Sequence, residues 1–334
     1  NTLPAEITAF VVTVTTDGIP VATLKIPRSQ FVSGEFATSD ERVFPRVTKA
    51  NAPHFKPSNS FALGPYWRLS LFDPDSPFRY EIGLSAEARI GISRGTSVSL
   101  QIDDAALSTF DDATRRSNSV LPHVRSDWAL YAQTNNPRIS RLTLDHHFRL
   151  SGDIFGRFSA GYFEHMYASV SAEVLWHPLG ASLSFGAEIN WLQQRDFDGF
   201  LGLRDYNIWS GHASAYADFA DDYELQLDLG RYLAGDWGAT FHFKRAFANG
   251  VKVGAFATLT DVSFTDFGEG SFDKGISFEI PISWLSGQPS SQTVTTIIRP
   301  VYRDGGARVN IPSRLYQTVH KSRTIGKNWE AFYR

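Results

Sequence analysis

Acidic side chains recur at alternate positions of several apolar runs, and they are the residues of this sequence best placed to do chemistry. They are Glu188, Glu224, Asp228 and Glu279, with the cations Arg195 and Lys252 near them in the pattern. If these charges face a common interior, they could form a balanced network of ion pairs or a polar path for a hydrophilic polymer. Two such carboxylates about 5 to 9.5 Å apart could instead act as acid and base on a glycosidic bond.

Other patterns of catalytic or metal-binding residues are weak. Residues 91–95 match G-x-S-x-G, but a nucleophile elbow requires a following helix, and residues 96–102 alternate like a strand. We therefore predict a hairpin turn there. The histidines are scattered and lack an i,i+4 pair that would gather metal ligands on a helix. Paired acids at 103–104, 111–112 and 221–222 stand beside predicted turns, where aspartate is favoured. No catalytic residue, metal site or cofactor is predicted.

Composition narrows the class of protein. The chain has 334 residues, of which 42% are hydrophobic, and a net charge of −3 that gives no basic surface for nucleic acid. It contains no cysteine, which suits an oxidising cell envelope. No apolar stretch approaches the roughly 20 residues of a membrane-spanning helix, so a membrane protein would have to be a barrel. The 14% aromatic content suits interfacial girdles or the core of a large sandwich.

A strict alternation of apolar and polar residues runs along most of the chain. In its clearest run, residues 80–93, large apolar residues and alanine alternate with charged and small ones. Such a strand is long for a soluble domain and fits a bilayer crossing of roughly 9–11 residues. Twelve strands are predicted, near 65–72, 79–93, 96–104, 139–151, 154–164, 167–177, 181–194, 207–219, 222–233, 237–247, 250–261 and 275–285.

The predicted connections are of two kinds. Tight turns separate some strands, whereas longer loops at 105–138, 195–206 and 262–274 fall mostly on the other end. Short turns at one rim and long loops at the other are typical of outer-membrane barrels. The fold predicted is therefore all-β, an antiparallel transmembrane outer-membrane β-barrel of about 12 strands (12–14).

The distribution of charge favours lipid outside this barrel. A lysine or arginine on a lipid-facing position at the midplane costs about 2–4 kcal/mol, and the charges of the predicted strands fall on the polar face. His146 and Arg245 are exceptions, which an interfacial position or a β-bulge would explain. A two-sheet sandwich with a wet outer face would give the same alternation.

The two ends of the chain are expected to lie outside the barrel. Residues 1–60 contain apolar runs flanking Asp17-Gly18, a hairpin signal, and predict a small periplasmic α/β or β domain plus a linker. The barrel would cover 61–306. Residues 307–334 would form a periplasmic tail, because an even strand count returns the chain to its starting side and the basic residues of this tail would be costly in lipid. Because the sequence starts at Asn1 without a targeting segment, we expect a processed or truncated product.

Two glycine-rich segments are too elaborate for generic turns. They are residues 230–240, which include Asp236, and residues 267–275, which include Glu269, Asp273 and Lys274. The second is predicted to be an ordered extracellular loop, in which Asp273 or Glu269 pairs with Lys274 or with an arginine of a neighbouring loop.

These segments, together with 194–198, 211–216 and 299–308, resemble the YjbH/GfcD family of outer-membrane exopolysaccharide (capsule) biosynthesis and export proteins. The resemblance extends over most of residues 60–318 and implies an outer-membrane β-barrel of a Gram-negative bacterium without known catalytic activity. It also implies that this chain is a C-terminal portion of a longer protein. The motif residues carried over are His212, Asp236, Glu269, Asp273, Lys274, Arg303 and Asp304.

The predicted function is a non-enzymatic component of exopolysaccharide or capsule secretion and assembly. Polar lumenal residues would bond sugar hydroxyls, and Tyr216 and Phe256 could stack on sugar rings. The expected partners are exopolysaccharide, outer-membrane lipid and other polysaccharide-secretion proteins, and not nucleic acid. The lumen could also be filled by its own side chains or by residues 105–138. A polysaccharide-modifying enzyme in a barrel and a soluble β-sandwich that binds carbohydrate are the alternatives.

Overall fold

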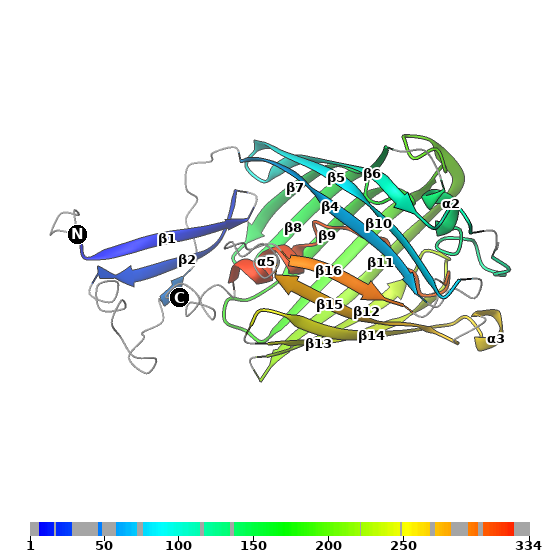
Figure 1. The fold of residues 1–334 in the computed structure, drawn as a ribbon. Helices are drawn as coiled ribbons and strands as arrows, with labels where there is room; N and C mark the ends of the chain where they lie inside the picture. The colour runs from blue at the N-terminus through cyan, green and yellow to red at the C-terminus, as the bar shows by residue number, and fades with distance from the viewer. Residues whose placement is uncertain are drawn as a thin grey trace.

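The computed structural model describes residues 7–16, 18–28, 46–48, 58–71, 76–113, 117–133, 137–220, 222–247, 249–267, 271–281, 293–299 and 303–323. Most of them belong to two antiparallel sheets (Figure 1). The smaller sheet has the order β1-β2-β3 and consists of β1 (Ala9–Thr16), β2 (Ile19–Pro27) and β3 (Arg46–Thr48). It lies beside one end of the larger sheet (Figure 1).

The larger sheet is a nearly closed barrel in which each strand pairs with the next in sequence. Its thirteen described strands are β4 (Asn59–Leu71), β5 (Phe78–Ser93), β6 (Thr96–Ser108), β7 (Arg138–Ser151), β8 (Ile154–Tyr162), β9 (Tyr167–Trp176), β10 (Leu183–Arg195), β11 (Leu203–Phe219), β12 (Tyr223–Arg231), β13 (Trp237–Ala246), β14 (Lys252–Thr260), β15 (Asp273–Pro281) and β16 (Thr293–Ile298).

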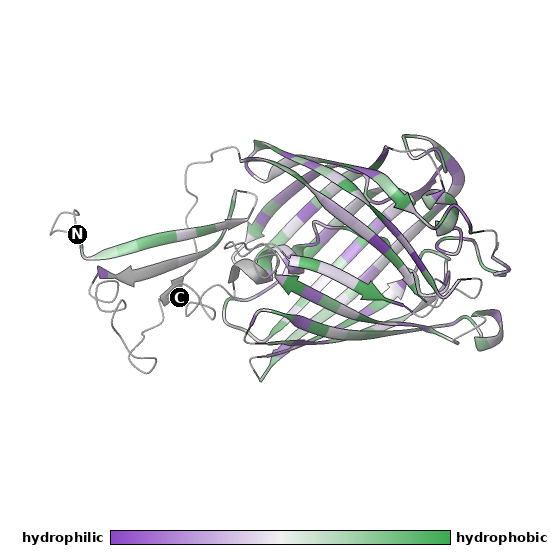
Figure 2. Ribbon diagram, in the orientation of Figure 1, coloured by the Kyte–Doolittle hydropathy of each residue, from purple (hydrophilic) through white to green (hydrophobic). Residues whose placement is uncertain are grey.

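The apolar face of this sheet points outward. Along β12, for example, Leu225 and Leu229 are 43% and 50% exposed, whereas Asp228 between them is fully buried inside the barrel. Figure 2 shows the same alternation of hydrophobic and hydrophilic residues along the other strands. The alternation predicted from the sequence is therefore that of a barrel with an apolar exterior. A two-sheet sandwich, which would bury its apolar face, is excluded.

The two ends of the barrel differ as predicted. Tight connections such as 94–95 and 152–153 lie at the end nearest β1 and β2. The connections 109–137, 196–202 and 261–272 lie at the opposite end, where helices α2 (Trp128–Ala132) and α3 (Phe264–Phe267) are found (Figure 1). We call these the short-turn end and the long-loop end. Among the helices in the described ranges, none has the length and apolar character needed to cross a membrane.

The thirteen described strands lie within the predicted range of 12–14 and number one more than the twelve that the sequence located. The twelve predicted strands correspond one for one to β4 through β15, and β16 was missed because its six residues offer too short an alternation. With thirteen strands, β4 and β16 run in the same direction, and the described residues contain no ladder between them. The last strand consequently ends at the long-loop end, opposite the end at which β4 begins.

Individual turn and face predictions can also be compared with the structure. Residues 91–95 form the end of a β5–β6 hairpin, as predicted, and Gly95 has a φ of +78° that glycine adopts readily. His146 and Arg245 both lie on the outer face without a bulge at either position. His146 contacts Thr96 through its Nδ1 at 2.9 Å, and Arg245 lies over an aromatic ring.

Candidate functional site in the barrel lumen

After β16 the chain turns back into the barrel. Residues 303–323, here called the lumenal segment, run from the long-loop end to the short-turn end and finish in helix α5 (Leu315–Arg323) (Figure 1). Helix α5 contacts β8 and β9 of the barrel and β1 and β2 of the small sheet. The sequence analysis placed residues 307–334 in a tail beyond the barrel. In the structure, residues 307–320 lie within the lumen, because the odd strand count leaves the chain at the long-loop end.

Two aspartates anchor the start of the lumenal segment. Oδ1 of Asp304 accepts hydrogen bonds from the backbone amides of Arg125 and Ser126 at 2.8 and 2.9 Å, and its Oδ2 accepts one from the Ser126 hydroxyl at 2.7 Å. Asp236, in the β12–β13 connection, accepts a bond from the Gly306 amide at 2.7 Å. Burial raises the pKa of Asp236. Both aspartates thus fasten the segment to loops at the long-loop end.

The glycines between these anchors are required by close packing. A Cβ atom at Gly305 would lie 2.7 Å from the ring of Phe267, and Gly306 has a φ of +71°. Neither position accepts a larger residue without displacement or strain. The glycines of the motif at 303–306 are therefore explained by the way the segment enters the lumen.

Arginines of the lumenal segment neutralise buried carboxylates of the barrel wall. Arg308 reaches Glu188 on β10 and Asp228 on β12, each at 2.8 Å, and Arg314 donates from its Nε to Glu188 at 2.9 Å. Nδ1 of His212 lies 3.5 Å from the same glutamate. Glu188 and Asp228 do face the interior, and the charges there are balanced. Their cationic partners, however, are Arg308 and Arg314 and not Arg195 or Lys252.

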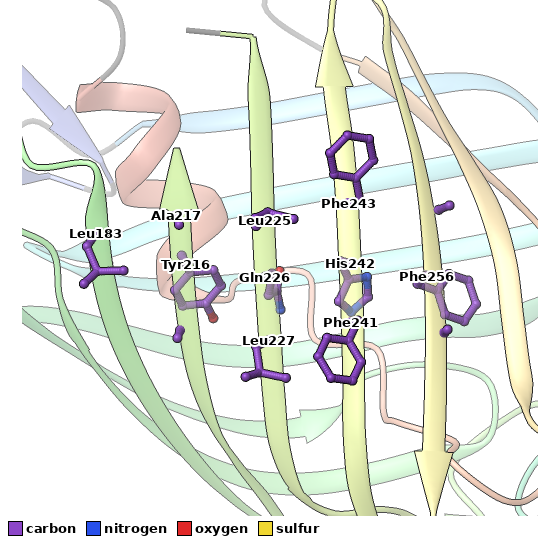
Figure 3. Close-up of a pocket in the computed structure, with 13 residues that line it drawn as sticks. Leu183, Tyr216, Ala217, Leu225, Gln226, Leu227, Phe241, His242, Phe243 and Phe256 are labelled. Atoms are coloured by element: carbon purple, nitrogen blue, oxygen red, sulfur yellow. The ribbon is translucent and has the colours of Figure 1, made fainter. Parts of the chain in front are cut away.

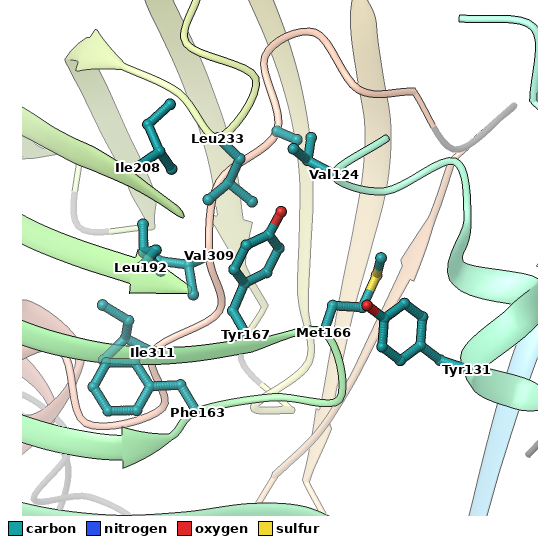
Figure 4. Close-up of a cluster of buried hydrophobic side chains, with 11 residues drawn as sticks. Val124, Tyr131, Phe163, Met166, Tyr167, Leu192, Ile208, Leu233, Val309 and Ile311 are labelled. Carbon is teal, nitrogen blue, oxygen red and sulfur yellow. The ribbon is translucent and has the colours of Figure 1, made fainter. Parts of the chain in front are cut away.

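An apolar cluster holds the segment beside this charged group (Figure 4). Val309 and Ile311, each 1% exposed, pack among side chains from β9 to β11 and from the loops at the long-loop end. The buried members of the cluster are Val124, Tyr131, Phe163, Met166, Tyr167, Leu192, Ile208, Leu233, Ala307, Val309 and Ile311. Residues 120–132 pack at the same end of the barrel. Within them, the Tyr131 hydroxyl donates a hydrogen bond to the Arg195 carbonyl at 2.6 Å. Burial raises the pKa of Tyr131 to about 12.

The end of the segment is fixed at the short-turn end. Ser313 donates to Asp145 at 2.7 Å, and the Leu315 amide donates to Glu173 at 3.1 Å. Tyr316 stacks on Tyr216 with ring centroids 3.8 Å apart and planes 7° apart. Tyr216 was a candidate platform for sugar rings, but its ring is buried under Tyr316.

Toward the short-turn end, the inward side chains of β12 to β15 are not covered by the lumenal segment, and we call this part of the lumen the uncovered wall. Toward the long-loop end the same strands do meet the segment, since Arg308 reaches Asp228 and Gly306 lies against Thr258. It carries the ion pairs Lys244–Glu279 at 2.6 Å and Lys252–Glu224 at 2.5 Å. These lysine side chains are 27% and 32% exposed, and His242 is 29% exposed. On the opposite wall, inward residues such as Arg157 and Ser171 are at most 1% exposed. The lumen is therefore packed along β8 and β9 and more accessible along the uncovered wall.

The remaining candidate residues lie at the long-loop end. Arg195 is buried and donates to the carbonyls of Glu164, Ile139 and Phe200, so it fastens loops together. Asp273 begins β15 and pairs with Arg299 at 2.5 Å.

The predicted partner of Asp273 was Lys274 or an arginine of a neighbouring loop. Arg299, which follows β16 at the long-loop end, is such an arginine, so this pairing is confirmed. Lys274 lies over the Phe272 ring at 4.2 Å. Arg303 is half-buried at the start of the lumenal segment, and Glu269 lies outside the described residues. Within the described ranges, no group of three His, Asp or Glu side chains is arranged to hold a metal ion.

The sequence analysis missed the residues that hold the segment in place. Arg308 is separated from Glu188 by 120 positions, and Ser313 from Asp145 by 168, so no local pattern connects them. One signal was present. Residues 307–311 alternate small or apolar residues with Arg308 and Asn310, which is the pattern of the barrel strands.

Loss of the Asp304 anchor should weaken the fold. We expect Asp304→Ala to lower the free energy of unfolding by about 2 kcal/mol, because two partly buried amides and one hydroxyl lose a charged acceptor. Urea unfolding followed by tryptophan fluorescence in detergent measures the change. Asp222→Ala, at an exposed turn, is the control and should change stability by less than about 0.5 kcal/mol. Equal effects of the two variants would show that Asp304 does not anchor the segment.

Comparison with known proteins gives two matches. Residues 1–321 match the model of a protein family described as "Exopolysaccharide biosynthesis protein YbjH". A protein of Escherichia coli (strain K12) named "Uncharacterized lipoprotein YjbH" is 31% identical to the chain over 284 residues. The alignment covers 83% of this chain and 40% of that protein, so the chain spans well under half the length of this relative.

Proposed function

Since this chain belongs to the YjbH family of exopolysaccharide biosynthesis proteins, we propose that it is a non-enzymatic outer-membrane β-barrel component of exopolysaccharide or capsule secretion and assembly. The observation that carries this proposal is the division of the barrel wall into an apolar exterior and an ion-paired interior. Lipid acyl chains can cover such an apolar exterior. Within the lipid, the neighbouring strands of a barrel hydrogen-bond one another's backbone groups.

The proposed orientation follows from the two ends. Bacterial barrels have short turns on the periplasmic side and longer loops on the cell surface. In this orientation the small sheet β1–β3 and helix α5 face the periplasm, and helices α2 and α3 face the exterior of the cell.

In this proposal the polymer contacts the uncovered wall. Its lysines, its glutamates and Gln226 supply donors and acceptors for sugar hydroxyls. Phe256, on the same wall, adds aromatic surface beside His242, although the Arg299 guanidinium lies over its ring at 4.7 Å. The lumenal segment is held on the opposite wall by Arg308 and the apolar cluster, so the polymer path lies beside it.

The pairing of the accessible carboxylates supports a role without catalysis. A general acid or base must present a free carboxylate oxygen to its substrate, whereas a carboxylate that accepts a lysine's hydrogen bond is engaged with that lysine. Glu224 and Glu279 are both in such contacts. Shortening or modification of purified exopolysaccharide by the pure protein would favour the enzyme alternative.

Chemical labelling at two serine positions tests whether the two walls of the lumen differ in accessibility. Because the chain has no cysteine, Ser277→Cys on the uncovered wall and Ser171→Cys on the packed wall each introduce a unique thiol. We expect a water-soluble maleimide to label position 277 in the folded barrel and position 171 only after unfolding, since Ser171 is 1% exposed. Mass spectrometry of the intact protein measures the labelling. Equal labelling rates in the folded protein would remove the distinction between the two walls.

A further inference from the structure

A groove of about 440 Å³ crosses the outer face of β11 to β14. Leu225 and Leu227 of β12 and Phe241 and Phe243 of β13 form its tall sides (Figure 3). Gln226 and His242, between these residues in sequence, belong to the inward set, so the groove opens away from the lumen. Gln226 and His242 also border the groove, but the surface that it exposes is mostly carbon.

The register of the strands explains why the surface is hollow here. Leu225 pairs with Phe243 across β12 and β13, and these two are flanked by Ala217 on β11 and Ala255 on β14. The next row repeats the order, with Leu227 and Phe241 between two alanines. The short alanines beside these bulky side chains leave room for a flexible chain against the wall.

A cation lies beside the groove on the same outer face. Arg245 is two residues beyond Phe243 on β13, toward the short-turn end, and is exposed. Its guanidinium lies over the rings of Tyr223 at 5.4 Å and Phe247 at 5.0 Å.

Aromatic side chains gather around this arginine. Phe219 stacks with Tyr223 at 5.2 Å, and Tyr223 stacks with Phe243 at 5.6 Å. Aromatic girdles of this kind lie at the level of lipid headgroups. Arg245 is consequently placed where a phosphate would be, with the groove at the depth of the acyl chains.

We propose that Arg245 and this groove form a binding site for one anionic phospholipid. The guanidinium binds the phosphate, for which its planar donors are well suited, and one acyl chain occupies the groove. This inference rests on the proposed membrane placement, in which the short-turn end faces the periplasm and the site lies in the inner leaflet. The ligand is therefore a glycerophospholipid, in contrast to the lipopolysaccharide of the outer leaflet.

Native mass spectrometry of the detergent-purified barrel tests the site, with phosphatidylglycerol as the probe. We expect one molecule to bind preferentially over phosphatidylcholine. Ala217→Phe, which fills the groove, should weaken binding about tenfold, equivalent to about 1.4 kcal/mol. Arg245→Gln should abolish the preference for the anionic lipid. Ala86→Phe, at an exposed outward position of β5, is the matched control and should bind like the wild type.

The outcomes separate this inference from the proposed function. Heat-modifiable migration on gels reports a folded barrel for each variant. Folded barrels with equal phosphatidylglycerol binding in all four proteins would overturn the lipid site and leave the membrane placement standing. Equal binding of both phospholipids by the wild type would overturn the assignment of Arg245 to the phosphate. Preferential binding of lipid A would overturn the placement of the site in the inner leaflet.

Discussion

Leu227→Arg is expected to abolish assembly of the barrel into membranes. Leu227 lies on the outer face at the middle of β12, where an arginine facing lipid costs about 2–4 kcal/mol. That is a large part of the stability of an ordinary domain. The wild-type protein should require detergent for extraction and give a heat-modifiable band, and the variant should lose that band from the outer-membrane fraction.

The adjacent residue provides the control. Gln226→Arg introduces the same side chain one position away, on the uncovered wall, where Asp228 and Glu224 are near. Because strand periodicity is two, this arginine would face water and carboxylates, and the band should be retained. Equal loss of assembly in both variants would contradict either the register or the apolar exterior. A wild-type protein that is monodisperse in plain buffer would contradict the membrane placement itself.

Arg308→Ala is expected to cause the largest loss of stability among lumenal substitutions. It leaves Glu188 and Asp228 buried without their shared guanidinium, although Arg314 and His212 stay near Glu188 and His242 stays near Asp228. Removal of one partner from a buried ion pair typically costs about 3–5 kcal/mol. Urea unfolding in detergent micelles, followed by tryptophan fluorescence, measures the difference.

A lysine of the uncovered wall is the comparison for this arginine. Lys244→Ala also removes a cation from a carboxylate, but the pair it forms with Glu279 is partly exposed. Exposed pairs contribute about 0–1 kcal/mol, so this variant should unfold nearly like the wild type. If Arg308→Ala unfolded at the same urea concentration as Lys244→Ala, the lumenal segment would not be held by its buried charges.

Most of the barrel wall could be predicted from the sequence because each strand carries its own signal. The alternation along β5 or β12 is complete within one strand, and the faces of Glu188, Asp228 and Glu279 follow from it. The hairpin at residues 91–95 and the long connections were also predictable. Strand β16 was not, since a six-residue run with three threonines gives little contrast between its faces.

The lumenal segment could not be predicted for a different reason. Its contacts join residues more than a hundred positions apart, such as Arg308 with Glu188 and Asp304 with Ser126. The missed strand reversed the side on which the barrel ends, which is why residues 307–320 were expected outside the barrel. Residues 324–334 of the predicted tail lie outside the described residues. Because of the thirteenth strand, the chain leaves the sheet at the long-loop end. Asp236 and Asp304 lie at that end, where they can anchor the segment that enters the lumen. Tyr216 faces inward as the alternation predicts, but Tyr316 covers its ring. The alternation along a strand therefore does not show whether an inward residue is accessible.

Export of exopolysaccharide by cells carrying Ser277→Cys or Ser171→Cys tests the central claim most directly. The measurement is surface polysaccharide before and after treatment with a bulky maleimide, at equal amounts of heat-modifiable barrel. We expect the adduct at position 277 to lower surface polysaccharide severalfold, while treated cells with the thiol at position 171 should behave like untreated ones. Full labelling at position 277 with unchanged surface polysaccharide would contradict a polymer path along the uncovered wall.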